Sequence, residues 1–307
     1  MSQIEYAIVV KSKTRLEQLV ARYNTRAQAR FYIEANGGDF SFYEQEHETY
    51  YASLDEVQRK LGAIMKYKLL EREFVSTYLF SEQHLVVTVG QDGLVANTAK
   101  YVGSRPIVAI NPDESRYDGV LLPFNPRNFV IAVWQVLKGG YSTREIALAE
   151  ARLQDGQRLL AFNELFVGAA SHTSARYKIS FREQEAWHSS SGLLLSTKAG
   201  STAWMSSVFN MVQGVAQAFG GPKQWAPPQM EGEELLFAVR EPFASKTSQI
   251  ELSAGRVRST ERLELTSQMP ERGVIFSDGI EQDFLQFNSG AIASLGLAPE
   301  RVQLVQA

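Results

Sequence analysis

The sequence of 307 residues contains no cysteine. Disulfide bonds, thiolate metal sites and a cysteine nucleophile are therefore excluded. No apolar run approaches the ~20 residues that span a bilayer, and the first residues show no small-residue cleavage site. The formal net charge is only −3, so a strongly basic face for duplex nucleic acid is not expected. These absences predict a soluble cytoplasmic protein that binds neither nucleic acid nor a membrane.

Common metal and hydrolase motifs are also missing. The histidines are His47, His84, His172 and His188. None of them shows a metal-ligand spacing such as HExxH. Ser201 lies in GSTAW rather than in the GxSxG of a nucleophile elbow. We therefore expect neither a metal held tightly by protein side chains nor a hydrolase triad.

The first half of the chain alternates strand-like and helix-like segments. The run Leu85–Val89 has no polar face, which suits a strand buried on both sides of a parallel sheet. A short crossover helix and a second apolar run follow it and complete one βαβ unit, which predicts an open α/β sheet. Strands are expected at Tyr6–Val10, Leu85–Val89 and Pro106–Ile110, and helices at Thr14–Ala35, Leu54–Leu69 and Leu94–Val102. The aromatic stretch Phe40–Tyr51 is interleaved with glutamates and is expected to be a packed or loop surface.

The second half, from about residue 140, is predicted to be β-rich. Short apolar runs recur with turn residues between most of them. They are FNELFVG, ARYKISF, SGLLLST, ELLFAVRE, RLELT and GVIFS. One helix is expected at Ala203–Phe219, a loop or mobile flap at Gly220–Gly232, and a turn at Asp278-Gly279.

The turn Gly90-Gln91-Asp92-Gly93 directly follows the buried strand. A strand that ends in glycines lets the backbone approach a phosphate closely and aims the next helix N-terminus at it. A carboxylate there would repel a phosphate, but it has a purpose if it binds Mg²⁺ or accepts a proton from an attacking hydroxyl. The alternative is an Asx turn that caps the following helix.

Two further segments carry candidate binding groups. The adjacent amide and carboxylate of Asn163-Glu164 can clamp a ribose diol, whereas the simpler alternative is a pair of polar residues on an edge strand. In SSGLLLSTKAGSTAW, residues 190–204, an apolar strand runs into a turn rich in Ser, Thr and Gly. Hydroxyls, free backbone N–H groups and Lys198 could form an anion or ribose cradle there. The alternative is a plain helix start capped by Ser201 or Thr202.

Taken together and in this order, these segments resemble the NAD kinase superfamily, which also includes lipid kinases of the diacylglycerol and sphingosine type. The likeness is strongest to the mitochondrial NAD kinases of animals and their bacterial relatives, and the segments that carry it are SSG, the terminal Trp204, LFAVREPFAS and FNSGAIAS. The resemblance implies a Rossmann-like α/β domain (1–135) and a β-rich, sandwich-like domain (136–285). The C-terminal segment (286–307) is expected to return to the first domain.

The resemblance also implies an activity, which is phosphoryl transfer from ATP or polyphosphate to the adenosine ribose 2′-hydroxyl of NAD. Mg²⁺ would arrive with ATP, and the protein would form a homodimer or higher homo-oligomer. Asp92 would be the catalytic carboxylate. The residues expected to bind nucleotide are Gly90, Gln91, Gly93, Asn111, Asn163, Glu164, Ser191, Lys198, Gly200, Ser201, Thr202, Ala203 and Trp204. Among these, Asn111 would help close the pocket and Trp204 would form an aromatic wall.

The sequence departs from the family pattern at three positions. Gln91 replaces the second glycine of the turn, Leu94 stands where a threonine or serine is frequent, and Ser191 replaces an aspartate of the common bacterial enzymes. Gln91 could obstruct the donor phosphates or donate a hydrogen bond to them. Two alternatives follow, namely a nucleotide-binding protein with weakened catalysis and a kinase of another hydroxyl, such as a lipid or a sugar.

Overall fold

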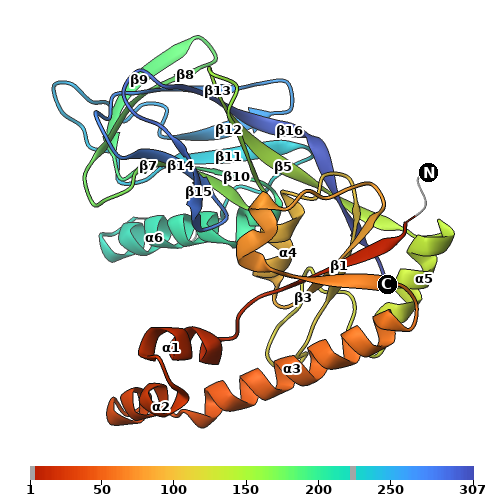
Figure 1. Ribbon diagram of the computed structural model, residues 1–307. Helices are drawn as coiled ribbons and strands as arrows, with labels where there is room; N and C mark the ends of the chain where they lie inside the picture. Colours follow the sequence, from red (N-terminus) through yellow and green to blue (C-terminus); the bar gives the residue numbers. More distant parts are fainter. Residues whose placement is uncertain (1–3, 222–225) are drawn as a thin grey trace. The chain divides into compact units, whose positions relative to one another are not determined.

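The computed structural model describes residues 4–221 and 226–307 (Figure 1). The chain divides into two compact units. The first consists of Met1–Glu145 together with Val302–Ala307, and the second of Ile146–Arg301. An α/β unit thus accompanies a β-rich unit, and the expected fold class is confirmed.

The first unit is built on a parallel sheet in the order β2-β1-β3-β4. These strands are β2 (Lys66–Glu71), β1 (Tyr6–Lys11), β3 (His84–Val89) and β4 (Pro106–Ile110). The end of β16 (Ile292–Val305) adds to β4 in parallel through Gln303 and Leu304. The central strands β3 and β4 are buried on both faces, as their continuous apolar sequences predicted.

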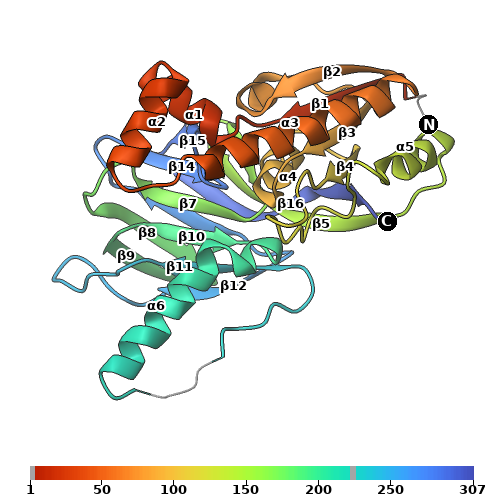
Figure 2. The ribbon, with the colours of Figure 1, turned by 90° about the horizontal axis from the view of Figure 1, so that it is seen from below.

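Helices cover this sheet (Figure 2). Tyr50, Leu54, Val57 and Leu61 of α3 pack with residues of β1, β3, β4 and α5 in one buried cluster. The crossover helix α4 contacts β1 and β3. The helical segments of the first unit are α1 (Arg15–Tyr23), α2 (Arg26–Ala35), α3 (Ser41–Gly62), η1 (Arg72–Thr77), α4 (Asp92–Ala99) and α5 (Phe129–Lys138).

Two predicted helices of this unit differ from the structure. The helix expected at Thr14–Ala35 is broken at Asn24, whose φ of 67° lies in the left-handed region. Thr14 and Thr25 cap the two resulting helices with their hydroxyls, so each has its own start signal. The helix expected at Leu54–Leu69 instead begins at Ser41 and ends at Gly62, which places Phe40–Tyr51 mainly in a helix. Residues from Lys66 onward form the edge strand β2, in which Leu70 alone is buried, so no alternation of apolar and polar residues marks a strand.

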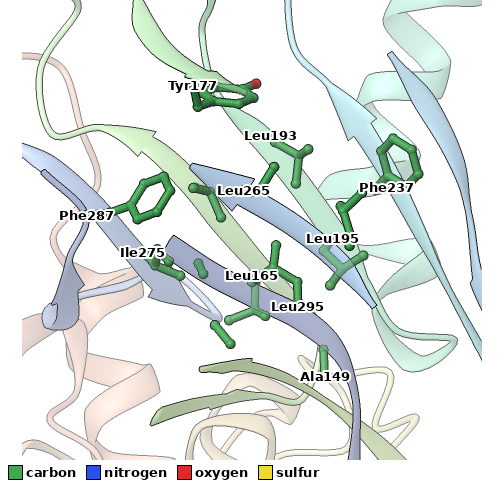
Figure 3. Packing of buried hydrophobic residues seen from close by; sticks show 14 of the residues in the cluster. Ala149, Leu165, Tyr177, Leu193, Leu195, Phe237, Leu265, Ile275, Phe287 and Leu295 are labelled. Atoms are coloured by element: carbon green, nitrogen blue, oxygen red, sulfur yellow. The ribbon is translucent and has the colours of Figure 1, made fainter. Parts of the chain in front are cut away.

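The second unit is a sandwich of two sheets. One contains β16-β13-β8-β9, with β5 and β6 attached, and the other is β12-β11-β10-β7-β14-β15. Side chains of both sheets, including Tyr177, Leu193 and Leu295, share one core (Figure 3). The strands are β5 (Thr143–Leu153), β6 (Arg158–Ala161), β7 (Glu164–Ala169), β8 (Ala175–Phe181), β9 (Gln184–Ser190), β10 (Leu193–Ser196), β11 (Glu234–Val239), β12 (Ala254–Arg258), β13 (Leu263–Ser267), β14 (Gly273–Ser277) and β15 (Ile280–Gln286).

The six predicted runs of the second half correspond to β7, β8, β10, β11, β13 and β14. The predicted helix is α6 (Trp204–Ala218), preceded by the 3-10 turn η2 (Ala199–Thr202). Part of the loop expected at Gly220–Gly232, residues 222–225, lies outside the described residues. The described part of that stretch contains no helix or strand.

Candidate functional site

The glycine turn of the first unit joins β3 to α4. The Gly90 N–H donates to the carbonyl of Ile110 at 3.2 Å, which ties the end of β3 to β4. A Cβ on Gly90 would lie 2.7 Å from Cδ2 of Leu94, so the buried Leu94 fills the space that this glycine leaves. A Cβ on Gly93 would meet nothing within 4 Å. The Leu94 side chain therefore packs against the bare backbone of Gly90, whereas the space beside Gly93 is open within the unit.

Asp92 is the first residue of α4. Its Oδ1 accepts a hydrogen bond of 2.6 Å from the backbone N–H of Leu121. This bond fixes the orientation of a half-buried carboxylate at a helix N-terminus, where the helix dipole favours negative charge. The Asx-turn alternative is not borne out, because the N-cap is Gln91 and no side chain caps the helix.

The two remaining predicted residues of this unit lie in different environments. Gln91 is exposed and has φ −78° and ψ 168°, a conformation open to any residue, so glutamine does not strain the turn. Asn111 is buried, and both polar atoms of its side-chain amide form hydrogen bonds. Nδ2 donates to the Tyr117 carbonyl at 3.1 Å, and Oδ1 accepts from the Asp113 N–H at 3.0 Å. Asn111 thus shapes the loop that leads to Leu121 rather than presenting its amide at a surface.

In the second unit, strand register gathers the predicted residues at one end of a sheet. Glu164 begins β7 and pairs with Ser196 at the end of β10. Leu165 pairs with Ser277 at the end of β14. Because β7 is antiparallel to both neighbours, its first residues lie beside their last residues. Asn163-Glu164, the turn after β10 and Asp278 after β14 therefore come together.

The turn after β10 packs directly on the backbone of Asn163. The Thr197 N–H donates to the Asn163 carbonyl at 2.8 Å, and the Thr197 hydroxyl donates to the Phe162 carbonyl at 2.5 Å. The Gly200 N–H in turn donates to the Thr197 hydroxyl at 3.1 Å. A Cβ on Gly200 would lie 2.1 Å from the Asn163 carbonyl oxygen, closer than any real contact. The middle glycine of KAGST is therefore required by close approach of two backbones.

The residues around the start of α6 differ from the capping prediction. Ala203 is the N-cap and no side chain caps the helix, so the alternative with Ser201 or Thr202 as cap is wrong. The Ser201 hydroxyl donates instead to the carbonyl of Lys198 at 2.8 Å. Lys198 and Thr202 are exposed. The backbone N–H of Trp204, at the first position of α6, donates to the carboxyl group of Glu164.

Glu164 is an acid of this cluster with a strongly raised pKa. Its side chain is buried, with 7% of the residue exposed. Burial, followed by the nearby charge of Asp278, raises the pKa of Glu164 to about 7, and the Trp204 N–H opposes this change. Glu164 can therefore gain or lose a proton close to neutral pH, which is unusual for a glutamate and frequent at functional sites.

A cavity of about 690 Å³ lies within the second unit. Ser191 and Trp204 both line it. The Trp204 ring stacks on Phe166 at 5.6 Å between centroids, and the guanidinium of Arg240 lies 5.1 Å from the Trp204 centroid. The other lining residues include Phe276, Phe284, His172, Glu241 and Glu281. The arrangement offers an aromatic wall with polar and charged groups around it, which is typical of ligand pockets.

The part of the chain that the structure describes contains neither a candidate metal cluster nor a helix suited to cross a membrane. Among residues 4–221 and 226–307, no group of three or more His, Cys, Asp or Glu is placed to hold a metal ion. Within the same ranges, no helix has the length and apolar character needed to cross a membrane.

Sequence comparison finds curated relatives for part of the chain. No protein-family model matches it. The NAD kinase of Chlorobaculum tepidum is 27% identical over 124 residues, which is 39% of this chain and 43% of the relative. The NAD kinase of Chlorobium phaeobacteroides is 29% identical over 126 residues, again 39% of this chain and 43% of the relative. The alignments thus span less than half the length of these relatives.

Solved structures extend the likeness in fold to the whole chain. The yeast NADH kinase complexed with NADH has a TM-score of 0.59 at 13% identity, with 100% of this chain and 84% of the other covered. The chain resembles the NAD kinase family in sequence and in fold. The NAD kinase from Archaeoglobus fulgidus in complex with ATP has a TM-score of 0.56 at 16% identity, with 98% and 93% covered. The NAD kinase fold inferred from the motifs is confirmed.

Several residues of the candidate site were not identified from the sequence. The sequence indicates only a turn at Asp278, whereas its carboxylate accepts hydrogen bonds from the backbone of Phe162, Asn163 and Glu164. Leu121 and Arg240 were likewise not singled out. Their contacts join positions far apart in the sequence, and no local pattern signals such contacts. The dipeptide Asp278-Gly279 was the one available signal, and it indicates a hairpin turn only.

Proposed function

We propose that the protein is an NAD kinase, which transfers a phosphoryl group from ATP to the 2′-hydroxyl of the adenosine ribose of NAD. The observation that carries the proposal is Asp92, a carboxylate held in a fixed orientation at the start of α4, directly after a buried parallel strand and a packing glycine. Ligands of open α/β sheets bind at this carboxyl edge of the strands. The sequence likeness to curated NAD kinases and the fold shared with nucleotide-bound structures support the assignment.

Asp92 would act as general base toward the 2′-hydroxyl. Phosphoryl transfer needs little covalent chemistry from the protein, and most of the catalysis comes from positioning and charge. A base contributes about 10²–10⁴-fold. The hydrogen bond from the Leu121 N–H fixes the Asp92 carboxylate before substrate arrives. The side chain therefore loses little conformational entropy when substrate binds. The open space beside Gly93 and the N-terminus of α4 are suited to donor phosphates, and Mg²⁺ would accompany the donor.

The second unit would supply the contacts to the dinucleotide. Asn163 and Glu164 combine an amide and a carboxyl that can both accept from and donate to ribose hydroxyls or a base edge. Glu164 does so in particular because its pKa near 7 leaves part of the population protonated at neutral pH. The turn from Lys198 to Trp204 would contribute hydroxyls and a positive charge, and Trp204 would form one wall of the ligand cavity.

We also propose that the protein belongs to the mitochondrial-type branch. Two segments that carry this likeness touch each other, because Arg240 of the LFAVREPFAS segment lies over the Trp204 ring.

A homodimer or larger symmetric assembly in the cytoplasm is part of the same proposal, and open β-sheet edges favour such pairing. Light scattering at micromolar protein should report at least twice the 34.3 kDa mass of the chain, and a monomer would contradict the assembly.

The test of the activity is a coupled assay with purified protein, ATP and Mg²⁺. NAD should be converted to NADP with saturation in both substrates. If only NADH is phosphorylated, the acceptor is the reduced form. If NAD binds in calorimetry but no NADP forms, the protein is a nucleotide-binding member with lost catalysis. Phosphorylation of a lipid or sugar without activity on NAD would replace the proposal altogether.

A further inference from the structure

Asp278 lies at a junction of the second unit where a hairpin meets the start of another strand. Asp278 and Gly279 are the two turn residues between β14 and β15, with φ of 52° and 69°. Aspartate and glycine are the residues that tolerate such positive values in a tight hairpin. The Asp278 N–H donates to the Glu164 carbonyl at 3.1 Å, which continues the pairing of β14 with β7. The turn therefore places the Asp278 side chain beside the first residues of β7.

The Asp278 carboxylate holds the backbone that carries Asn163 and Glu164. Oδ2 accepts from the Phe162 N–H at 3.0 Å, and Oδ1 accepts from the N–H groups of Asn163 at 2.7 Å and Glu164 at 3.2 Å. These residues form the bend between β6, which ends at Ala161, and β7, which begins at Glu164. Consecutive N–H groups in a bend need acceptors other than a neighbouring strand, and one carboxylate supplies them.

The same carboxylate acts electrostatically on Glu164. The groups that act on the Glu164 carboxyl come from two elements, Asp278 from the β14–β15 hairpin and the Trp204 N–H from the start of α6. The charged residue of the neighbouring turn is Lys198, which is exposed. Burial and the charge of Asp278 both favour the neutral carboxyl, whereas the Trp204 N–H favours the ionised form. Removal of the Asp278 charge should therefore make Glu164 a stronger acid.

We propose that Asp278 is a positioning residue for the Asn163–Glu164 pair, holding the backbone of both residues with its carboxylate and placing a second acidic group beside the Glu164 side chain. This proposal rests on the proposed function, in which Asn163 and Glu164 contact the nucleotide. An ionised carboxylate only accepts hydrogen bonds, whereas a neutral carboxyl also donates one. Nucleotide phosphates are also repelled less when Glu164 is neutral. NAD should accordingly bind more tightly at a pH below the pKa of Glu164 than at a pH above it.

The experiment follows Glu164 directly by ¹³C NMR of side-chain carboxyls between pH 3 and 9, with Glu164→Gln used to assign the signal. In the wild type the signal should titrate near pH 7. In Asp278→Asn the midpoint should fall by half a pH unit or more. The matched control is Asp155→Asn, because Asp155 also precedes a glycine in a hairpin turn and accepts from a backbone N–H, that of Gln157 at 3.1 Å. This control should leave the Glu164 midpoint unchanged.

A second measurement connects the titration to binding. Calorimetry should show that NAD binds the wild type several-fold more weakly at pH 8.5 than at pH 5.5, with the change centred near the Glu164 midpoint. In Asp278→Asn the change should be centred at lower pH. A wild-type Glu164 that titrates near its ordinary value would overturn the inference even if Asp278→Asn does not fold. An unchanged midpoint in a folded Asp278→Asn would also overturn it. Absence of NAD binding at all pH values, with the NMR midpoints as expected, would instead refute the proposed function.

Discussion

Replacement of Glu164 by glutamine should stabilise the protein at alkaline pH. The pKa of Glu164 rises from 4.5 to about 7 on folding, so the folded state holds a proton that the unfolded state has lost. Between the unfolded-state and folded-state pKa values, the free energy of unfolding falls as the pH rises. Above about pH 7 the whole destabilisation by the ionised carboxylate is present. A difference of about 2.5 in pKa at about 1.36 kcal/mol per unit corresponds to at most about 3.4 kcal/mol.

Glutamine removes this ionisation while it keeps the size of the side chain. Glu164→Gln should therefore unfold at a higher temperature than the wild type at pH 8, by an amount that corresponds to about 2–3 kcal/mol. The two proteins should differ little at pH 4.5, where the wild-type carboxyl is neutral in the folded state. The assay is the midpoint of thermal unfolding, measured by circular dichroism at a series of pH values for both proteins.

Glu185→Gln is the matched control for this prediction. Glu185 lies in the same unit but is exposed, and hydrogen bonds from Lys178 and Ser180 lower its pKa. Its replacement should bring no stabilisation at pH 8, because the ionised form is the one favoured by the fold. An equal effect of Glu164→Gln on the unfolding midpoint at pH 4.5 and pH 8, or a lower midpoint at pH 8, would contradict this prediction.

Three further substitutions test separate parts of the site. Asp92→Asn should lower kcat by about 10²-fold or more while NAD binding stays within a few-fold, and near-normal turnover in steady-state kinetics would contradict its role as base. Gln91→Gly should mainly raise the KM for ATP, because the exposed amide is expected to donate to the donor phosphates; a large rise in kcat from a near-zero wild-type value would show instead that Gln91 blocks the site. Gly200→Ala should destabilise the protein by about 2 kcal/mol or more, because its Cβ would lie 2.1 Å from the Asn163 carbonyl oxygen. The control Gly214→Ala, where a Cβ meets nothing within 4 Å inside helix α6, should stabilise by about 0.5–1 kcal/mol in the same melting experiment.

The elements that could be predicted from sequence are those whose burial is uniform or whose turns carry their own signal. Leu85–Val89 and Pro106–Ile110 are buried throughout, so their apolar runs leave no ambiguity about a central parallel strand. The helix α6 was expected within one residue at each end. Edge strand β2 was missed because an exposed strand has no apolar pattern to show. The break at Asn24 was missed because a single left-handed residue changes nothing in the surrounding helical periodicity.

In the candidate site, too, the sequence identified the residues that belong to local motifs and missed their distant partners. Its motifs could be found because glycines, an acid and hydroxyls stand at fixed local spacings, and the structure shows a packing reason for two of those glycines, Gly90 and Gly200. The partners of these motifs could not be found. Leu121 contributes only its backbone N–H to Asp92, so its side chain carries no signal for that contact. Asp278 reaches its partners across more than a hundred residues, because the pairing of β14 with β7 brings them together. The roles of all these residues in catalysis and binding stay predictions.

The pairing of β16 with β4 has a consequence for how the protein is made on the ribosome. The first unit needs Val302–Ala307 in addition to its N-terminal stretch, and Val305 is fully buried in its core. Gln303 and Leu304 complete the sheet beside Pro106 and Ile107. During vectorial synthesis the first unit therefore cannot close its sheet until the whole second unit has been translated. A nascent chain stopped before Val302 should leave β4 with an open edge, which is a state that chaperones bind and that aggregates readily.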